Sequence, residues 1–444
     1  MKENLKDNGT YGLFTAITMI VGIVVGSGIY FKSDDIIIAT NGNILLGIFV
    51  LVFCSLGMVF GSLSVSEYSI RVKGGTVIDF YLKYINKDMA IAYGNFQFLV
   101  LFPTVGIIVA WVAAIYTFNI LEINPPKYMT YVVGIMYIFL ITIINIYSKK
   151  LGGYLQNIST ILKLVPIFLV GILAIFLINK FQINLPNEVL EREISSSNVS
   201  WLTAVLPIIF SYEGWMMATN IAKEVKNPEK NMNIALVVAP LIVVIGYIIY
   251  FVGLSILVTP EGLMKAQDDA ISILFSQLFG SFGGKAILIV ILISILGVCN
   301  GVTLCGMRIP YLLSKDKLIN LKGVDKVDEK YGVSIKAAVI YFIICTIWMI
   351  IHYITTTTGV IGNNDVSEIA VIFNYIICLP LYLSILKNKE VTNKLRGYIS
   401  PLIAILFTII ITIISLIVNP FYIMLFFTIC TVITILSVKV LKNE

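Results

Sequence analysis

Two short segments inside long apolar runs carry residue types that could bind a polar ligand. The first run contains three glycines and a serine within VGIVVGSGIY (21–30), and a later run contains Glu213 within FSYEGW (210–215). Glycine releases the backbone from regular helical geometry. The N–H and C=O groups at such a break can hold a polar ligand directly, so these segments predict binding. Close helix packing is the alternative explanation for the spacing of Gly22 and Gly26.

A lysine lies deep in another apolar run. Lys163, in ILKLVPIF, follows Lys150 by thirteen residues, which is roughly 20 Å of helix. If the run crosses a membrane, a charge at that depth costs a few kcal/mol or more and becomes a functional hypothesis. The alternative is a lysine that snorkels to the interface.

Two acidic residues, Glu213 and Glu67, also lie within apolar runs. Glu213 could contact a cationic group of a substrate, form an internal pair with Lys163 or a hydroxyl, or become protonated by desolvation and carry a proton. Glu67, near the end of its apolar run, could serve a gate or pair with Arg71 four residues later.

The other reactive residue types argue against a metal centre and against an enzyme. All six cysteines lie in apolar runs and form no CxxC pair, which is typical of buried free thiols. The only histidine is His352, so no metal site is expected. The sequence contains no HExxH, no paired intramembrane aspartates and no serine–histidine arrangement. We therefore expect no cofactor and no catalytic activity.

The composition requires a bilayer as solvent. Of 444 residues, 58% are hydrophobic and 13% are charged, and the mean hydropathy is +0.95. A soluble protein of this length could not bury so much apolar surface. A membrane-spanning helix needs about 20 mostly apolar residues. Twelve predicted spans meet this requirement: 11–31, 42–70, 89–119, 128–148, 153–179, 201–222, 232–258, 282–310, 334–354, 366–386, 398–418 and 420–440.

Basic residues support this span count. With the N-terminus inside, 24 of the 31 lysines and arginines fall in inner segments, six fall in outer segments, and Lys163 lies within a span. This is the distribution that the positive-inside rule requires, and it places both termini in the cytoplasm. The net charge of +6 thus reflects topology rather than nucleic-acid binding. No loop is long enough for a soluble domain, so residues 1–444 are expected to form one transmembrane domain.

The two interrupted spans, the first and the sixth, occupy matching positions in two five-span halves. An unwound helix survives in a membrane only where it lines a cavity enclosed by protein. Paired interruptions of this kind are typical of secondary transporters built from inverted repeats. We expect the first repeat over 11–179, the second over 201–386, and two peripheral helices over 398–440.

Four motifs, in order and on the expected spans, resemble those of a known family. They are GIVVGSGIY (22–30), SEYSIRVKGGTVIDFYLKYI (66–85), FSYEGWMMATNIAKEVKNPEKNM (210–232) and GVCNGVTLCGMRIPYLLSKDKLI (297–319). They look like segments of the amino acid–polyamine–organocation superfamily, and of its L-amino acid transporter branch in particular. The resemblance implies an all-α membrane protein with twelve transmembrane helices: five plus five inverted helices of the LeuT-like fold and two peripheral ones.

The resemblance also implies substrate contacts. The substrate carboxylate would be held by the backbone N–H groups of Gly26, Ser27 and Gly28, which form a half-helix N-terminus. The ammonium would be held by backbone carbonyls at the two broken ends, which are those of Ile23 or Val24, and of Phe210. The Phe210 side chain matches an aromatic residue that closes over the substrate.

Lys163 matches a lysine that replaces a sodium ion in this family. Its ammonium would bind carbonyls near Gly22 and a group in the eighth span, which implies sodium-independent transport. The sequence departs from the family where many relatives have asparagines and this chain has Met216 and Met217. Substrate preference therefore does not follow from the resemblance.

The function expected from these features is sodium-independent exchange of L-amino acids by alternating access in the plasma membrane. The alternative is a proton-coupled amino acid permease, or a polyamine permease, that uses Glu213. An ion channel is disfavoured because no carbonyl-ring filter motif occurs. Amino acids and membrane lipid are the expected partners. The outer loops contain no cysteine that could form a disulfide with a partner subunit, so the chain is expected to act alone, with no obligate partner subunit.

Overall fold

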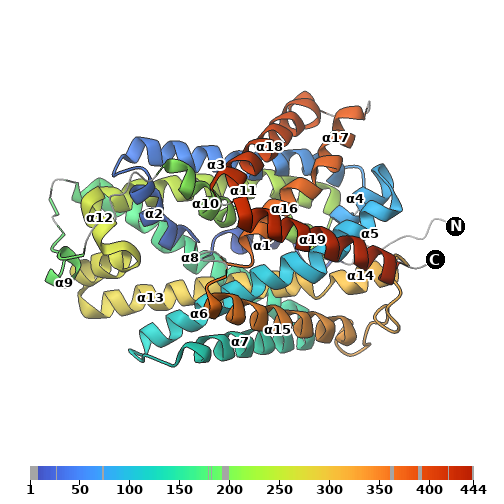
Figure 1. The fold of residues 1–444 in the computed structure, drawn as a ribbon, viewed down its shortest axis with the longest axis horizontal. Helices are drawn as coiled ribbons and strands as arrows, with labels where there is room; N and C mark the ends of the chain where they lie inside the picture. Colours follow the sequence, from blue (N-terminus) through green and yellow to red (C-terminus); the bar gives the residue numbers. More distant parts are fainter. Residues whose placement is uncertain are drawn as a thin grey trace.

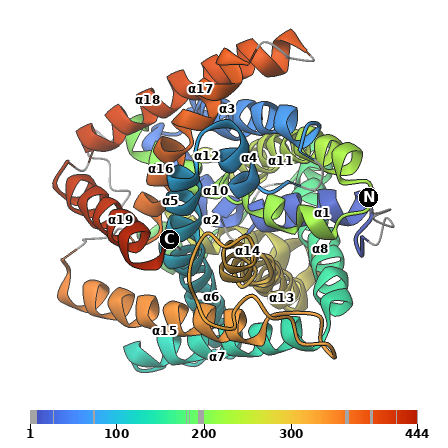
Figure 2. The ribbon, with the colours of Figure 1, turned by 90° about the vertical axis from the view of Figure 1, so that its right-hand side faces the viewer.

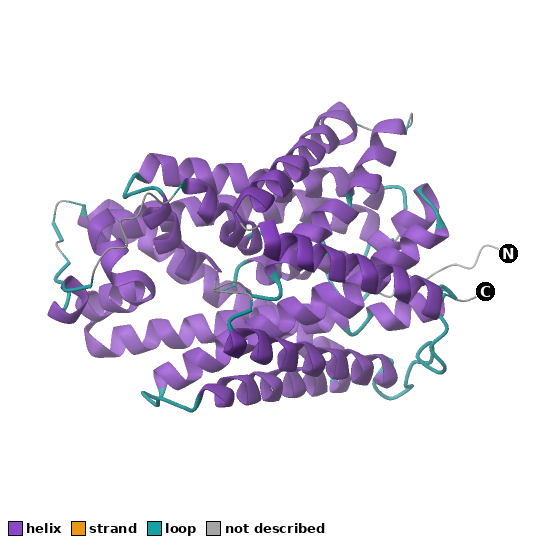
Figure 3. Ribbon diagram, viewed as in Figure 1, coloured by secondary structure: helices purple, strands orange, loops and turns teal. Residues whose placement is uncertain are grey.

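The structure is a computed structural model that describes residues 9–26, 28–72, 75–178, 180–181, 183–192, 200–360, 365–388, 393–418 and 420–442. Nearly all of these residues are helical (Figure 3), and no β-strand forms within these ranges. Two isolated backbone bridges join Tyr11 to Val225 and Ile319 to Lys442. We call the end of the bundle that carries these bridges the terminal face, because both ends of the chain approach it (Figure 1).

Ten segments of the described chain are long and apolar enough to cross a membrane. Their helices are α3 (Ile44–Ser69), α5 (Lys87–Phe96) joined through a π-helical turn (Gln97–Leu101) to α6 (Phe102–Ile120), α7 (Lys127–Tyr147), α8 (Lys149–Leu177), α11 (Pro228–Val258), α13 (Ala270–Gly306), α15 (Ile335–Thr358), α16 (Glu368–Ile377) with α17 (Leu379–Lys387), α18 (Ser400–Val418) preceded by a π-helical turn (Leu395–Ile399), and α19 (Pro420–Leu441). Shorter helices connect them: α4 (Val77–Tyr84), α9 (Asn187–Leu190), α12 (Pro260–Ala266), η4 (Gln267–Asp269) and α14 (Ile309–Lys315).

Two further spans are interrupted, as the sequence predicts. The first consists of α1 (Leu13–Val24) and α2 (Gly28–Ala39). The sixth consists of a 3-10 turn (Trp201–Ala204), α10 (Val205–Ser211) and, beyond a non-helical turn, the 3-10 helix η3 (Met217–Glu224). With the ten long segments, these account for all twelve predicted spans.

Two predicted span boundaries are wrong. The first span was expected to end at residue 31, but α2 continues to Ala39. Lys32, Asp34 and Asp35, whose charges suggested the end of the span, lie within this helix. Their charges face a vestibule described below, and so they do not end the span. The eighth span was expected to begin at 282, but α13 begins at Ala270 and bends at Gly280, whose φ is 75°.

Side-chain caps explain several helix starts. The Asn43 side chain accepts the backbone N–H of Leu46 at the start of α3, and Ser148 caps α8 in the same manner. Thr76 and Asp79 form a reciprocal capping box at α4. Each cap satisfies an N–H group that the helix leaves unpaired.

The interrupted spans lie inside the bundle. Viewed from the terminal face, α2 and α10 lie near the middle, and α7, α15, α18 and α19 lie around the outside (Figure 2). α1 packs against α8, α11 and α13. The peripheral helices expose many large apolar side chains, including Ile409, Ile413 and Ile417 on α18. Apolar exposure on this scale is expected where lipid covers the surface.

The arrangement predicts which loops react from opposite sides of a membrane. Asn124 lies in the exposed turn between α6 and α7, and Lys326 lies in an exposed loop on the terminal face. All six native cysteines are buried, so they provide low background for a membrane-impermeant maleimide. In sealed vesicles of one orientation, reagent added outside should therefore label only one of the two single variants, Asn124→Cys or Lys326→Cys. Reagent trapped inside should label only the other. Labelling of both variants from one side would contradict the fold.

Candidate functional site

The break in the first span leaves several backbone carbonyls without helical partners. α1 ends at Val24, and Val25 and Gly26 are non-helical before α2 begins at Gly28. Ser27, one of the predicted carboxylate ligands, lies outside the described residues. Carbonyls at the end of α1 must find partners within the protein, because a bilayer offers none.

Lys163 supplies one of these partners. Its Nζ atom donates hydrogen bonds of 2.8 Å to the carbonyl oxygen of Gly22 and of 2.8 Å to that of Val25. The residue is 0% exposed and does not snorkel to either face. The expected third contact with the eighth span is not a hydrogen bond among the described residues. There, the backbone at Gly297 of α13 passes beside the ammonium, and a Cβ at that position would lie 3.4 Å from Nζ.

Tyr247, on α11, supplies a second partner and connects the two breaks. Its hydroxyl lies 3.2 Å from the carbonyl oxygen of Val24 and 2.9 Å from that of Ser211. The side chain thus joins the end of α1 to the end of α10. Sequence analysis missed this residue, because a tyrosine in an apolar span carries no signal that distinguishes it from the neighbouring Tyr250.

The break in the sixth span depends on a glycine. Gly214 has a φ of +106°, which L side chains rarely adopt. A Cβ there would lie 2.5 Å from Cγ2 of Ile23, so the two breaks touch at this point. At Gly22, a Cβ would collide with Gln156 and Thr160 of α8, so the close-packing explanation applies there as well.

The two breaks enclose a small cavity of about 30 Å³. Six of the seven predicted substrate ligands line it: Ile23, Val24, Gly26, Gly28, Phe210 and Glu213. Apolar residues of other helices complete its wall: Val105 and Val109 from α6 and Val298 from α13. Lys163 and Glu67 do not line the cavity. The structure therefore separates residues that could contact a ligand from residues that could only support or gate the site.

Glu213 is a buried carboxylate without a cation. It is 5% exposed, and its Oε1 atom accepts a hydrogen bond of 3.1 Å from Nδ2 of Asn374. Its Oε2 atom is buried and has no hydrogen-bond partner among the described residues. Lys163 instead binds the first-span carbonyls, so the expected Glu213–Lys163 pair does not form. Sequence analysis also missed Asn374, which lies far away in the chain.

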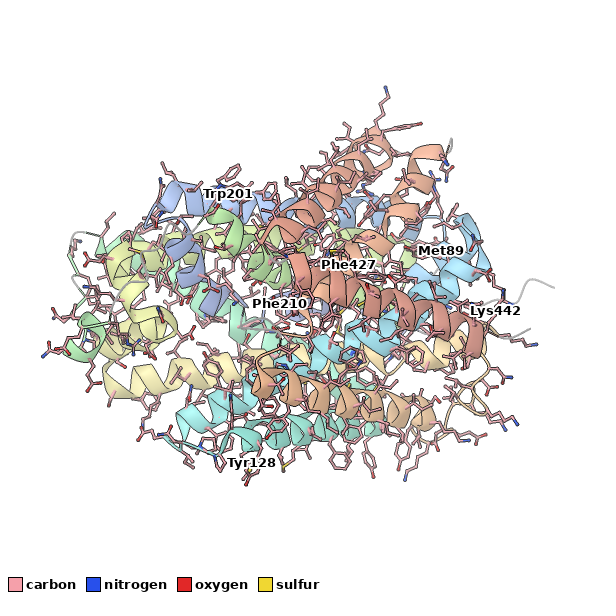
Figure 4. The ribbon with its side chains drawn as sticks, viewed as in Figure 1. Met89, Tyr128, Trp201, Phe210, Phe427 and Lys442 are labelled. Carbon is pink, nitrogen blue, oxygen red and sulfur yellow. The ribbon has the colours of Figure 1, made fainter. Side chains whose placement is uncertain are left out.

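Phe210 separates the cavity from a larger space. It lies near the centre of the molecule (Figure 4) and lines both the small cavity and a vestibule of about 970 Å³. Gly28 and Val109 line both spaces as well. The vestibule extends away from the terminal face, toward the ends of α2 and α6 and the starts of α13 and α16.

Ion pairs close the opposite end. Arg308 donates to both carboxylate oxygens of Glu224, at the end of η3, and is 7% exposed. Lys223 pairs with Asp79 at 3.2 Å and with Asp316 at 3.6 Å. These contacts tie η3 to α4 and to both ends of α14, which Arg308 precedes and Asp316 follows. None of them was predicted from the sequence.

The Glu67–Arg71 pair is local to one helix. Its N–O distance is 2.8 Å, and Glu67 is buried at the terminal end of α3. The i,i+4 pair expected from the sequence is thus present. The gate role proposed for Glu67 stays a prediction.

Comparison with known proteins gives a clear relation. A family model described as amino acid permease matches residues 11–441, which is nearly the whole chain. The chain belongs to the amino acid permease family. The identification from the four motifs is therefore confirmed, as are the all-helical membrane fold and a role in amino acid transport.

Several curated proteins are similar to the permease. It is 25% identical over 407 residues to the serine/threonine exchanger SteT of Bacillus subtilis, covering 89% of this chain and 88% of that protein. It is 23% identical over 345 residues to the human b(0,+)-type amino acid transporter 1, covering 76% and 69%. It is 22% identical over 320 residues to the human cystine/glutamate transporter, covering 71% and 62%. These relatives are transporters rather than enzymes.

The bridge made by Tyr247 generates a prediction for the permease. Tyr247→Phe removes the hydroxyl that joins α1 to α10, and a hydrogen bond of this kind contributes about 0.5–1.5 kcal/mol. We expect substrate binding in detergent to weaken by a few-fold to about tenfold. Tyr250→Phe is the matched control, because the Tyr250 hydroxyl is buried without a hydrogen-bond partner in the described chain. Equal affinities in the two variants would show that the bridge does not shape the site.

Proposed function

We propose that the permease exchanges L-amino acids across the plasma membrane by alternating access, without sodium and as a single chain. The observation that carries this proposal is the meeting of both broken helices at one enclosed cavity, with Lys163 bound to the first-span carbonyls. Similarity to the serine/threonine exchanger of Bacillus subtilis supports exchange rather than one-way uptake.

The geometry of the breaks fits the two charged ends of an amino acid. The N-terminus of α2 begins at Gly28, where unpaired N–H groups and the helix dipole favour a carboxylate. The carbonyl ends of α1 and α10, at Val24 and Phe210, favour an ammonium. Both ends lie on the wall of the same cavity, which at about 30 Å³ holds little more than a water molecule, so the breaks would have to move apart for a single amino acid to bridge them.

Lys163 explains independence from sodium. Its ammonium contacts two carbonyl oxygens at a break, which is the type of ligand that a hard cation would otherwise bind. A covalently attached cation fills this position permanently. The break then keeps its shape whether or not sodium is present.

Alternating access assigns different roles to the two sides of the cavity. On one side Phe210, with Gly28 and Val109, lies between the cavity and the vestibule. On the other side the Arg308–Glu224 and Lys223 ion pairs hold η3 closed. Opening toward the terminal face would require these pairs to separate while Phe210 covers the substrate. Glu67 would act in this step by fixing the Arg71 side chain nearby.

A proton-coupled permease is the second candidate. It is favoured by the buried Oε2 atom of Glu213, which has no partner in the described chain. A proton on this carboxyl would remove the cost of burying the charge. Dependence of uptake on an imposed proton gradient would distinguish this candidate from plain exchange.

The distribution of basic residues supports a cytoplasmic terminal face. The proposal of one inverted repeat over 11–179 and a second over 201–386 fits the positions of the two breaks.

Action without a partner subunit rests on the absence of cysteine from the outer loops. Purification of the chain alone in active form would test it.

The first prediction of this proposal concerns Lys163. Hydrogen bonds from a charged donor contribute about 1.5–3 kcal/mol each, so Lys163→Ala should lower exchange more than about tenfold, although the side chain lies outside the cavity. Lys163→Gln should fail nearly as badly, because an amide lacks the charge that organises both carbonyls. Uptake by the wild type should be equal in sodium and in a large inert cation. Clear stimulation by sodium would overturn the assignment.

The second prediction concerns the carboxylate position. Gly26→Val should abolish amino acid binding in a protein that still inserts and remains monodisperse, because the branched side chain fills the space of the carboxylate and stiffens the break. Gly12→Val is the control, since a Cβ at Gly12 meets no atom within 4 Å. Normal uptake by the Gly26 variant would refute this assignment.

A further inference from the structure

The vestibule above Phe210 is strongly acidic. Seven carboxylates line it, and Lys32 is the one basic side chain among its lining residues. The seven are Asp34, Asp35, Glu122, Asp268, Asp269, Asp365 and Glu368. They come from four separate parts of the chain, so the fold rather than a local sequence run gathers these acidic side chains.

Three of these carboxylates are already neutralised. Lys32 pairs with Asp35 at 2.9 Å, and Arg192 pairs with Asp269 at 2.9 Å. Lys285 pairs with Glu122 at 2.7 Å, and this contact lowers the pKa of the Glu122 carboxyl. Among the described residues, no ion pair neutralises the other four, which are Asp34, Asp268, Asp365 and Glu368. Those four leave the vestibule with more acidic than basic side chains.

Asp34 is the carboxylate that points to a ligand. It is only 7% exposed, and yet it lines the vestibule. Its Oδ1 atom is buried and accepts no hydrogen bond from any residue that the structure describes. A buried carboxylate oxygen without a partner is costly, and a bound cation would remove that cost.

The surroundings favour an organic cation over a metal ion. Trp111, Tyr116 and Phe210 also line the vestibule, and aromatic faces attract ammonium and guanidinium groups. No three Asp, Glu, His or Cys side chains within the described ranges converge closely enough to hold a metal ion. The volume of about 970 Å³ is ample for an amino acid.

We propose that this vestibule is an outer binding site for amino acids with a cationic side chain, and that Asp34 binds the ammonium or guanidinium group. The proposal rests on the function proposed above and names a substrate class for it. Asp34 lies six residues beyond Gly28 on α2, about 9 Å along the helix. An extended lysine or arginine side chain can reach from the floor of the vestibule to Asp34.

A net cation gains from this field, whereas a zwitterion gains little. The unpaired carboxylates attract a cationic amino acid from solution, and Asp34 with the aromatic faces then holds its side chain next to Phe210. A neutral amino acid enters the same path without this assistance. An amino acid with an anionic side chain is repelled.

The test compares arginine with serine and leucine as labelled probes. Purified wild-type and Asp34→Asn permease are reconstituted in proteoliposomes, and exchange is measured from the vestibule side. In the variant we expect the KM for arginine to rise about tenfold and its dependence on ionic strength to weaken. The KM for serine or leucine should change less than about twofold. Asp325→Asn, an exposed change of equal charge on the terminal face, should leave all three unchanged.

Each alternative outcome overturns the proposal in a recognisable way. Equal losses for arginine and the neutral probes would make Asp34 a structural residue. Exchange of serine or leucine without binding or uptake of arginine would refute the cationic class and leave the proposed exchanger intact. Loss of arginine binding in millimolar Ca²⁺ at constant ionic strength would indicate a metal site instead. Failure of every amino acid to exchange would refute the proposed function itself.

Discussion

Backbone groups at the two broken helices cannot turn to lipid, and the rest of the structure is arranged around that constraint. Each unsatisfied carbonyl in hydrocarbon costs several kcal/mol, so a break survives only with internal partners. Lys163 satisfies Gly22 and Val25, and the Tyr247 hydroxyl contacts the carbonyls of Val24 and Ser211. Both partners come from helices that pack directly on α1. The breaks therefore keep their shape inside the bundle, and residues of both line the same cavity.

The sequence reveals the parts of this arrangement that depend on the cost of burial. Long apolar runs predicted every span, the glycines marked both breaks, and Lys163, thirteen residues beyond Lys150, was identified by its depth within a span. These signals are local, because a membrane penalises each polar group separately. The end of the first span was predicted wrongly for the same reason. Charged residues usually mark the end of a span, and the sequence does not show that the charges on α2 face a vestibule inside the protein.

Contacts between segments that are distant in the chain have no comparable signal in the sequence. Asn374 reaches Glu213 across 161 positions, and Tyr247 reaches Val24 across 223. The Arg308–Glu224 pair likewise joins two spans whose closeness only the fold determines. A single sequence shows that such residues are polar, but it does not show which of them meet. The supporting residues of the site were therefore missed, whereas the residues at the breaks themselves were found.

The buried charged residues differ in whether they have partners within the protein, and this difference suggests the route that a substrate takes. The Lys163 ammonium donates two hydrogen bonds to fixed carbonyls and lies outside the cavity, so it shapes the site without contacting a ligand. Glu213 and Asp34 each retain a buried oxygen without a partner in the described chain. One lies on the cavity side of Phe210 and the other on the vestibule side. A cationic group that leaves Asp34 and passes Phe210 would thus meet a second carboxylate, that of Glu213. The two carboxylates would lower the free-energy cost of placing the cation in the membrane before and after it passes Phe210.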